Sequence, residues 1–383
     1  MNRSCWLGIG VIALGLLAGP AGAATQYWDT ASTAGLQGGD GAWSTNVADA
    51  RWSDSAAGSA LSAWTTGNDA WFSTPGDLVA STVSLSNTVS VGAVRMTGSP
   101  YTLIVTNGGQ LSAATASTVG NSPATNQVRI TGVGSLWTNA SSLTIGNNAA
   151  VTVDTGGKLV IVGLTTVSSG TSVPYGLIIT NGGYVVCGVN FNTCIGGNAS
   201  RALVTGPGSV WSNKLTDPGS SAFFRLGDSG SGNALVISNG GMVVVWTEGG
   251  SAYSSFLGYN PGANSNTAII TGSGSVWTNN RRFYVGNMGS YNSVTIANGG
   301  AVYCSFGVIG YTANSNTVTV ADTGSVWQIV GLSSPLVLGF SANSRCNQLI
   351  ITNGGVVAAS WALIGCNSGA NSKSLYGLEH VPA

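Results

Sequence analysis

Residues 177–185 read LIITNGGYV, and this stretch decides the fold because similar stretches recur along most of the chain. Each copy has an apolar strand, a turn with two glycines and a second apolar strand. The other copies are LIVTNGGQL (103–111), LVISNGGMV (235–243), VTIANGGAV (294–302) and LIITNGGVV (349–357), with VTVDTGGKL (151–159) as a weaker one. A pattern that returns at a roughly fixed interval indicates stacked structural repeats.

A second version of the repeat has a turn one residue longer and ends in tryptophan. It reads RITGVGSLW (129–137), LVTGPGSVW (203–211), IITGSGSVW (269–277) and VTVADTGSVW (318–327). The ten copies are spaced 23 to 33 residues apart. Each period also contains an apolar residue, a glycine and usually a polar or aromatic residue, as in Leu257-Gly258-Tyr259. Three short strands in each period predict an all-β fold, a parallel β-helix of about ten coils.

The composition suits stacked strands and tight turns. Only 6% of the 383 residues are charged, 58 are glycine, and 12 basic residues balance 12 acidic ones. Soluble domains usually carry about 25% charged residues. A net charge of zero gives no attraction to nucleic acid or to an anionic membrane surface, so we expect neither as a partner.

The beginning of the chain reads as a secretory signal peptide, residues 1–23. Arg3 precedes a short apolar stretch, and Ala21-Gly22-Ala23 provides a small-residue cleavage site. We therefore expect cleavage near Ala23 and a secreted protein or one exposed at a bacterial surface. The mature chain has no further stretch that reads as a transmembrane span.

Residues 24–100 differ from the repeats and contain five tryptophans. We expect an amino-terminal cap and the first strands here, because the first coil of a solenoid must hide its open edge. A separate ligand-binding module is the alternative. The repetitive β-helix then covers residues 101–371, and residues 372–383 form an irregular tail.

Asparagine precedes the two glycines of the turn in five copies of the repeat. Coils stacked about 4.8 Å apart would bring side chains at one turn position close together. We expect a structural ladder in which their amides hydrogen-bond between coils, with ligand binding as the alternative. The five residues are Asn107, Asn181, Asn239, Asn298 and Asn353.

Five cysteines remain after cleavage of the signal peptide, and an odd number cannot pair completely. Cys187 and Cys304 occupy equivalent repeat positions, where we expect small buried side chains. A disulfide between Cys187 and Cys194 is the alternative. Because the chain has no C-x-x-C motif and its single histidine, His380, lies in the tail, we expect no cofactor and no metal site.

Strand alternation predicts an aromatic face on the outside of the coils. If the valine of each GSVW segment points inward, the tryptophan after it points outward. Trp277, Tyr303 and Trp327 would then form an exposed ladder that stacks on sugars or seats a partner protein. The alternative is that these rings only stiffen the stack through cross-strand pairing.

A carbohydrate-active enzyme, of the polysaccharide lyase or hydrolase type, is the competing interpretation of a β-helix. Such chemistry needs clustered carboxylates or calcium ligands. No acidic residues of the repeats are neighbours in sequence, although stacking could bring Asp228 near a residue one coil away. We therefore predict that the protein has no catalytic site.

The chain resembles autotransporter-associated β-strand repeat proteins and the passenger repeats of large bacterial surface proteins. WDTASTAGLQGGDGAWSTN (28–46), WTTGNDAWF (64–72) and the TGSGSVWTN unit (271–279) carry the resemblance, which extends over most of the mature chain. It implies a right-handed β-helix with a structural or adhesive role, whose partners are glycans or proteins of host or neighbouring cells. Such passengers are followed by a membrane barrel, whereas this chain ends in KSLYGLEHVPA. We therefore expect a truncated or frameshifted passenger or a released product.

Overall fold

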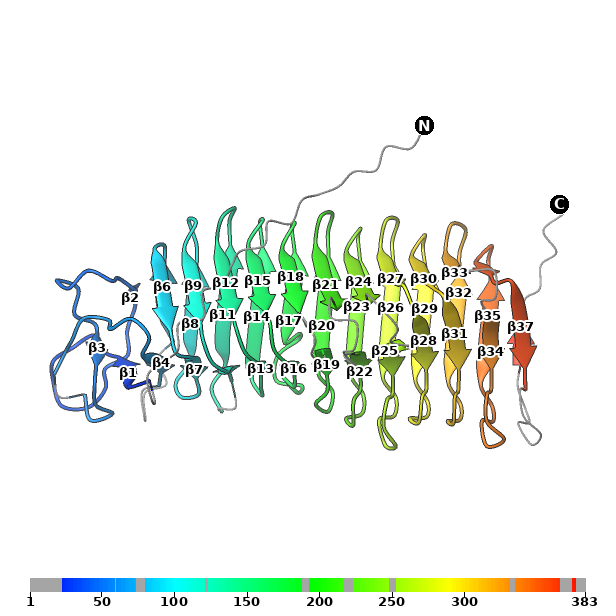
Figure 1. Ribbon diagram of the computed structural model, residues 1–383, viewed down its shortest axis with the longest axis horizontal. Helices are drawn as coiled ribbons and strands as arrows, with labels where there is room; N and C mark the ends of the chain where they lie inside the picture. Colours follow the sequence, from blue (N-terminus) through cyan, green and yellow to red (C-terminus); the bar gives the residue numbers. More distant parts are fainter. Residues whose placement is uncertain are drawn as a thin grey trace.

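The computed structural model describes residues 23–58, 60–73, 80–120, 123–187, 193–215, 223–247, 253–330, 335–365 and 374–376. They form an elongated parallel β-helix, as predicted (Figure 1). The predicted signal peptide lies outside the described residues except for Ala23, and so does the predicted tail except for Ser374–Tyr376. No helix among the described residues is long and apolar enough to cross a membrane.

Three long sheets, here called A, B and C, run the length of the molecule. Sheet A has 14 strands in the order β3 (Trp52–Ser53), β1 (Thr25–Trp28), β4 (Asp69–Phe72), β7 (Val94–Met96), β10 (Ser117–Val119), β13 (Leu143–Ile145), β16 (Thr165–Val167), β19 (Thr193–Ile195), β22 (Phe224–Leu226), β25 (Tyr253–Leu257), β28 (Arg282–Val285), β31 (Phe306–Ile309), β34 (Pro335–Leu338) and β37 (Trp361–Ile364). Sheet B has 13 strands in the order β2 (Gly41–Ala42), β5 (Ser81–Leu85), β8 (Tyr101–Val105), β11 (Asn126–Thr131), β14 (Ala149–Asp154), β17 (Leu177–Thr180), β20 (Arg201–Thr205), β23 (Ala234–Ser238), β26 (Thr267–Thr271), β29 (Ser293–Ala297), β32 (Thr317–Ala321), β35 (Gln348–Thr352) and β38 (Ser374–Tyr376). Sheet C has 11 strands in the order β6 (Thr88–Val91), β9 (Gln110–Ala113), β12 (Leu136–Asn139), β15 (Lys158–Ile161), β18 (Tyr184–Cys187), β21 (Val210–Leu215), β24 (Met242–Thr247), β27 (Val276–Asn279), β30 (Ala301–Cys304), β33 (Val326–Ile329) and β36 (Val356–Ala358).

Each coil passes through sheet B, then sheet C, then sheet A. The described residues contain eleven such coils, one for each strand of sheet C, from β5–β7 to β35–β37. The first coil lies before the first repeat that the sequence pattern reveals, because its turn lacks the paired glycines. Strands of neighbouring coils are parallel, and β1 with β3 in the cap is an antiparallel pair.

The core is one continuous apolar column enclosed by the three sheets. Small or branched apolar residues point into the column and alternate with residues that point outward. In β26, for example, Ala268 and Ile270 are buried. The corresponding residues of the next coil, Val294 and Ile296, pair with them in register. Full burial of such a side chain contributes about 1.5 to 3 kcal/mol, so each coil is stabilised mainly by its neighbours.

The two kinds of turn between sheets B and C alternate along much of the stack and complement each other. Gly240 and Gly299, from asparagine–glycine–glycine turns, donate their backbone N–H groups to Ser275 Oγ and Ser325 Oγ at 3.0 and 2.9 Å. Both serines come from the tryptophan-type turn of the next coil and are fully buried. The repeat is thus a pair of unlike coils, in which one turn satisfies the backbone of the other.

The asparagine ladder predicted at these turns is wrong. Asn239 and Asn298 adopt positive φ angles of 51 and 52°, and their amides donate to Thr205 Oγ1 and Thr271 Oγ1 at 3.3 and 3.0 Å. Most neighbouring coils carry the other turn, so no amide lies opposite. The five predicted asparagines share this left-handed conformation, which asparagine tolerates better than most residues; they are Asn107, Asn181, Asn239, Asn298 and Asn353.

An asparagine ladder does exist, at the turn from sheet A into sheet B. In each case Nδ2 donates to Oδ1 of the next coil at 2.9 to 3.1 Å, and the same oxygen accepts a backbone N–H. All five side chains are buried. The ladder also explains the third element of the repeat: a Cβ at Gly286 would overlap the amide of Asn316. The five residues are Asn233, Asn266, Asn292, Asn316 and Asn347.

The aromatic-rich segment packs at the first end of the stack of coils. Trp28, Trp43, Trp52 and Trp64 are buried and pack against one another and against Phe72 of β4. Their rings close the first end of the apolar column. The backbone of this segment is drawn in blue in Figure 1. The alternative of a separate module does not fit a segment whose strands continue sheets A and B.

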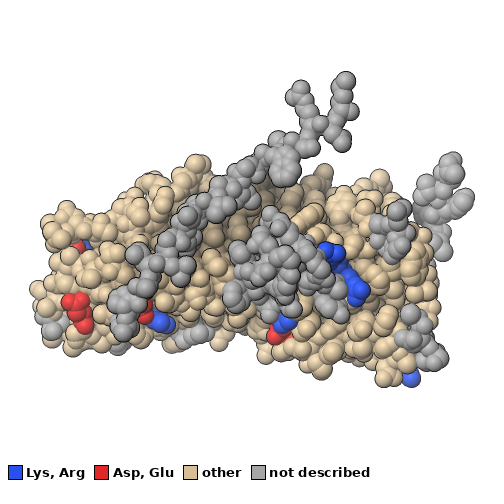
Figure 2. Space-filling view, viewed as in Figure 1, with Lys and Arg blue, Asp and Glu red and all other residues tan. Residues whose placement is uncertain are grey.

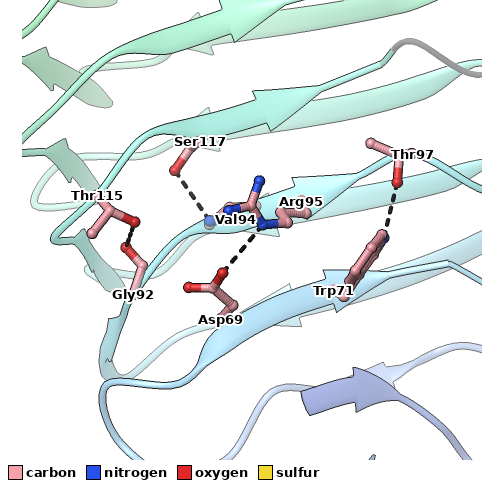
Figure 3. A network of polar contacts seen from close by, with 8 residues as sticks. All are labelled: Asp69, Trp71, Gly92, Val94, Arg95, Thr97, Thr115 and Ser117. Carbon is pink, nitrogen blue, oxygen red and sulfur yellow. Dashed lines mark hydrogen bonds and ion pairs between the residues drawn. The ribbon is translucent and has the colours of Figure 1, made fainter. Parts of the chain in front are cut away.

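Polar contacts tie the cap strand β4 to the first coils. Arg95 of β7 forms an ion pair with Asp69 of β4 at 3.2 Å, and Trp71 Nε1 donates to Thr97 Oγ1 at 2.8 Å (Figure 3). One coil further, Ser117 Oγ accepts the N–H of Val94 at 3.1 Å. The first two contacts lie on the solvent face of sheet A and the third is buried, and all of them hold successive coils in register.

Asp154, at the end of β14, is buried among hydrogen-bond donors. Arg129 Nε lies 2.7 Å from its carboxylate, Thr155 donates at 3.0 Å, and Thr131 donates as well. Burial raises the pKa of Asp154, but the hydrogen bonds and the charge of Arg129 outweigh it and hold the pKa below its ordinary value of 3.8.

Asn292→Ala should lower the free energy of unfolding by about 2 to 4 kcal/mol, because it leaves the backbone N–H of Asn266 without an acceptor and removes one of the two acceptors of its buried amide, the other being Ala263 O. Asn298→Gly is the matched control, since glycine adopts a positive φ readily. Chemical denaturation followed by circular dichroism would measure both. Equal effects of the two changes would contradict the assignment of the ladder.

Asp154→Asn should destabilise the protein at pH 7 and matter progressively less as the pH falls toward 2. The folded pKa lies below the unfolded one, so the stabilisation is present above about pH 3.8 and is lost as the pH falls through the folded value. Urea midpoints of the native and variant chains at several pH values test this. A difference between them that does not depend on pH would rule out the ionised carboxylate as the source.

Candidate functional site

The exposed aromatic face predicted at Trp277, Tyr303 and Trp327 is wrong. Both tryptophans are 0% exposed, and they pair in register with the buried Val302 between them. Only Tyr303 points outward, beside Thr278 and Gln328. The extra residue of the longer turn lies before the strand begins. Val276 therefore aligns with Ala301 and faces outward, and Trp277 after it enters the core.

The cysteines at the inner face of sheet C have the buried role predicted for them. Trp211 Nε1 donates to Cys187 Sγ at 3.2 Å, and Trp327 Nε1 to Cys304 Sγ at 3.4 Å. Cys187 and Cys194 are free thiols. They cannot pair readily because Cys187 points into the core, whereas Cys194 lies in the outward column of sheet A beside Thr166 and Arg225.

The outstanding surface feature is a cluster of rings on the solvent face of sheet A, here called the outer aromatic cluster. Phe256 and Tyr284 are outward residues of β25 and β28, yet each is only 2% exposed. They are covered by rings from the turns that follow the strands and from the start of β22. The rings of the cluster are Phe223, Phe256, Tyr259, Tyr284, Phe306, Tyr311 and Phe340, with Val308 and Val337 packed against them.

The rings of the outer aromatic cluster contact one another along the axis of the helix. Phe256 and Tyr284 stack with centroids 4.9 Å apart and planes 13° from parallel. Tyr259 and Tyr311 stand nearly perpendicular to these two, at 4.8 and 5.6 Å. Tyr311 in turn lies 4.7 Å from Phe340 of the next coil. The sequence does hold a signal for the cluster, since Tyr259, Tyr311 and Phe340 each follow the glycine of the third repeat element.

An ion pair lies at one end of the cluster. Arg225 Nη1 is 2.6 Å from Asp228 Oδ1, and the guanidinium carbon is 3.9 Å from the centre of the Tyr259 ring and 5.0 Å from that of Phe223. Such contacts between a cation and an aromatic face are favourable. Because the two charges neutralise each other, this part of the surface carries no net charge.

Two hollows lie side by side on this face. The Arg225 hollow, of about 310 Å³, lies over β16, β19 and β22; the Asn287 hollow, of about 230 Å³, lies over β22, β25 and β28. Arg225 lines the first and contacts Tyr259, which lines the second. Few charged side chains are visible on the side of the molecule in Figure 2, and the largest blue patch lies to the right of its middle. The arrangement offers an elongated and largely aromatic binding surface, with Arg225 at one end and the Arg282 guanidinium against Tyr284 Oη and the Phe306 ring.

The described acidic residues of the coils do not form a catalytic pair. Asp228 pairs with Arg225 of its own coil and Asp154 with Arg129, and these two carboxylates lie at different corners of the helix, two coils apart. Asp322 accepts the N–H of Asn298 at another turn. No three histidine, cysteine, aspartate or glutamate side chains gather as metal ligands within the described part of the chain.

No family model and no curated protein sequence matches the chain. Among solved structures, it is similar to a hyper-glycosylated fragment of TibA, residues 55–350, glycosylated by TibC. The two chains are 18% identical, and the match covers 82% of this chain and 92% of that one with a TM-score of 0.25. A likeness this distant carries no conclusion about function.

Of the four described cysteines, we expect only Cys346 to react with a maleimide in the folded protein at pH 8. Cys346 is exposed, whereas burial raises the pKa of Cys194 and Cys304 to about 12 and also raises that of Cys187. Mass spectrometry of peptides, with labelling in urea as the control, measures this. Rapid labelling of Cys187 or Cys304 without urea would contradict a closed core.

Proposed function

We propose that the protein is a secreted or surface-exposed, non-catalytic β-helix that adheres to glycans through its outer aromatic cluster. The signal-peptide pattern of residues 1–23 supports export. The observation that carries the proposal is the row of rings, with two hollows beside it, on the outer face of an otherwise sparsely charged rod.

The chemistry of this surface suits sugars. Sugar rings present apolar C–H faces that pack on aromatic rings, while tyrosine adds a hydroxyl group at the wet end of each ring. Binding sites combine apolar walls with a few polar groups that fix the orientation of the ligand. Tyr259, Tyr284, Tyr311 and Asn287 provide such groups around the Asn287 hollow.

The enzyme alternative has less support. Glycoside hydrolysis by two carboxylates needs them about 5 to 9.5 Å apart across the scissile bond. Asp228, the acidic residue that lines the Arg225 hollow, is held by Arg225. The aromatic surface therefore supports retention of a glycan better than its cleavage.

A glycan array and a cell-binding assay with the purified chain test the proposal. The double variant Tyr259→Ala/Tyr311→Ala should bind at least about tenfold more weakly, because stacking on each ring contributes about 1 kcal/mol. Tyr303→Ala on sheet C is the matched control and should bind like the native chain.

Absence of binding by the native chain would leave a purely structural rod. Loss of glycan binding in Tyr303→Ala, with binding retained in the double variant, would show that the glycan binds at sheet C instead. Release of unsaturated products from a polyuronate would favour the lyase interpretation.

A further inference from the structure

We propose that the Asn287 hollow is a subsite for a single uncharged sugar ring, an inference that rests on the glycan-binding function proposed above. The residues after the glycine of the third repeat element stack coil upon coil through backbone hydrogen bonds, such as Asn287 N–H to Gly258 O and Tyr311 N–H to Gly286 O. Along this row Asn287 stands where the neighbouring coils carry rings. The row reads Asp228, Tyr259, Asn287, Tyr311 and Phe340.

The gap in the row stays open because its surroundings are fixed. Asn287 is only 8% exposed, and its Nδ2 donates to the backbone oxygen of Tyr259 at 2.9 Å, so its short side chain is turned toward the backbone. The flanking rings are each held by the coil beyond them, Tyr259 by Arg225 and Tyr311 by Phe340. The hollow therefore needs little rearrangement before it binds a ligand, which lowers the entropy cost of binding.

The size of the hollow sets the size of the ligand. Its volume is about 230 Å³, below the roughly 300 to 1,000 Å³ of sites that enclose a drug-sized molecule. One coil spacing of about 4.8 Å separates Asn287 from the coil on each side. A ring at the position of Asn287 thus lies within the separation at which rings pack on aromatic neighbours.

The lining selects an uncharged ligand with hydroxyl groups. All the lining residues are phenylalanine, tyrosine or asparagine, so no ionisable carboxylate or amine faces the hollow. No described residue donates a hydrogen bond to Asn287 Oδ1, which can therefore accept one from a sugar hydroxyl.

Cationic and anionic ligands are both disfavoured in the Asn287 hollow. A quaternary ammonium group would meet the guanidinium of Arg225, which already lies on Tyr259. The carboxylate of a uronic acid would find Arg225 paired with Asp228, and the Arg282 guanidinium engaged with Tyr284 Oη and the Phe306 ring. A neutral hexopyranose satisfies the lining without either conflict.

Asn287→Phe is the decisive variant, because it fills the hollow with the kind of side chain that adjacent coils already carry. Asn343→Phe, at an exposed turn of the coil that ends in β34, is the matched control. Ligand-observed NMR would use the methyl glycosides of glucose, galactose and mannose, with glucuronic acid and choline as charged probes. Thermal unfolding verifies that each variant is folded.

We expect the native chain and Asn343→Phe to bind a neutral methyl glycoside, and Asn287→Phe to lose at least tenfold in affinity. Asn287→Ala, which keeps the hollow but removes the acceptor, should lose about fivefold, as for one hydrogen bond. Unchanged binding by Asn287→Phe, or a preference of the native chain for choline or glucuronic acid, would overturn the subsite. If the native chain retains no glycan on the array, the proposed function fails as well; if it retains glycans that Asn287→Phe still binds, only the subsite fails.

Discussion

Parallel backbone hydrogen bonds between successive coils are the interaction on which the rest of the structure depends. They place each residue directly above its counterpart one period earlier, as the pairing of Trp277 with Val302 and then Trp327 illustrates. Everything else follows from this register. An apolar column forms because inward residues coincide, and an outer row of rings forms because the residues after one glycine of each period coincide.

The same register makes polar side chains stable inside the stack. A buried amide without a partner costs about 1 to 3 kcal/mol, but a column of identical amides supplies each donor with an acceptor. Asn266, Asn292 and Asn316 do this at one corner, and buried serines such as Ser275 satisfy the backbone of the adjoining coil at another. Two corners are thus fixed by directional bonds, while the apolar column supplies most of the stabilisation.

The sequence was sufficient for the architecture and insufficient for the details of the surface. Repeats, glycine spacing and period-2 alternation predict the β-helix, its cap and the buried positions of Cys187 and Cys304, because these depend only on which residues recur. The direction of Trp277 depends on whether an extra turn residue lies before or after the strand begins, and a shift of one residue reverses every side chain. The pattern alone does not decide that question.

The asparagines posed a different difficulty. The asparagines beside the paired glycines are conspicuous because the motif is so regular. Asparagine occurs there because the turn requires a positive φ angle at that position, and the residue forms no ladder. The asparagines of the true ladder, such as Asn292, precede β-strands whose first residues vary, so no fixed motif marks them. The outer aromatic cluster was missed for a related reason: its rings follow a glycine in only some coils, and only stacking shows that the exceptions, above all Asn287, leave a hollow.

The single asparagine in a row of aromatic residues also bears on how such a rod changes over generations. Each coil contributes one residue to the row and contacts only its neighbours, so duplication or loss of a pair of coils moves the hollow along the rod and leaves the core pairing and the alternation of turns intact. Point substitutions at this position open or close a hollow without touching the apolar column. Substitutions in single coils can therefore change which ligand the surface binds, while the β-helix that carries this surface stays the same.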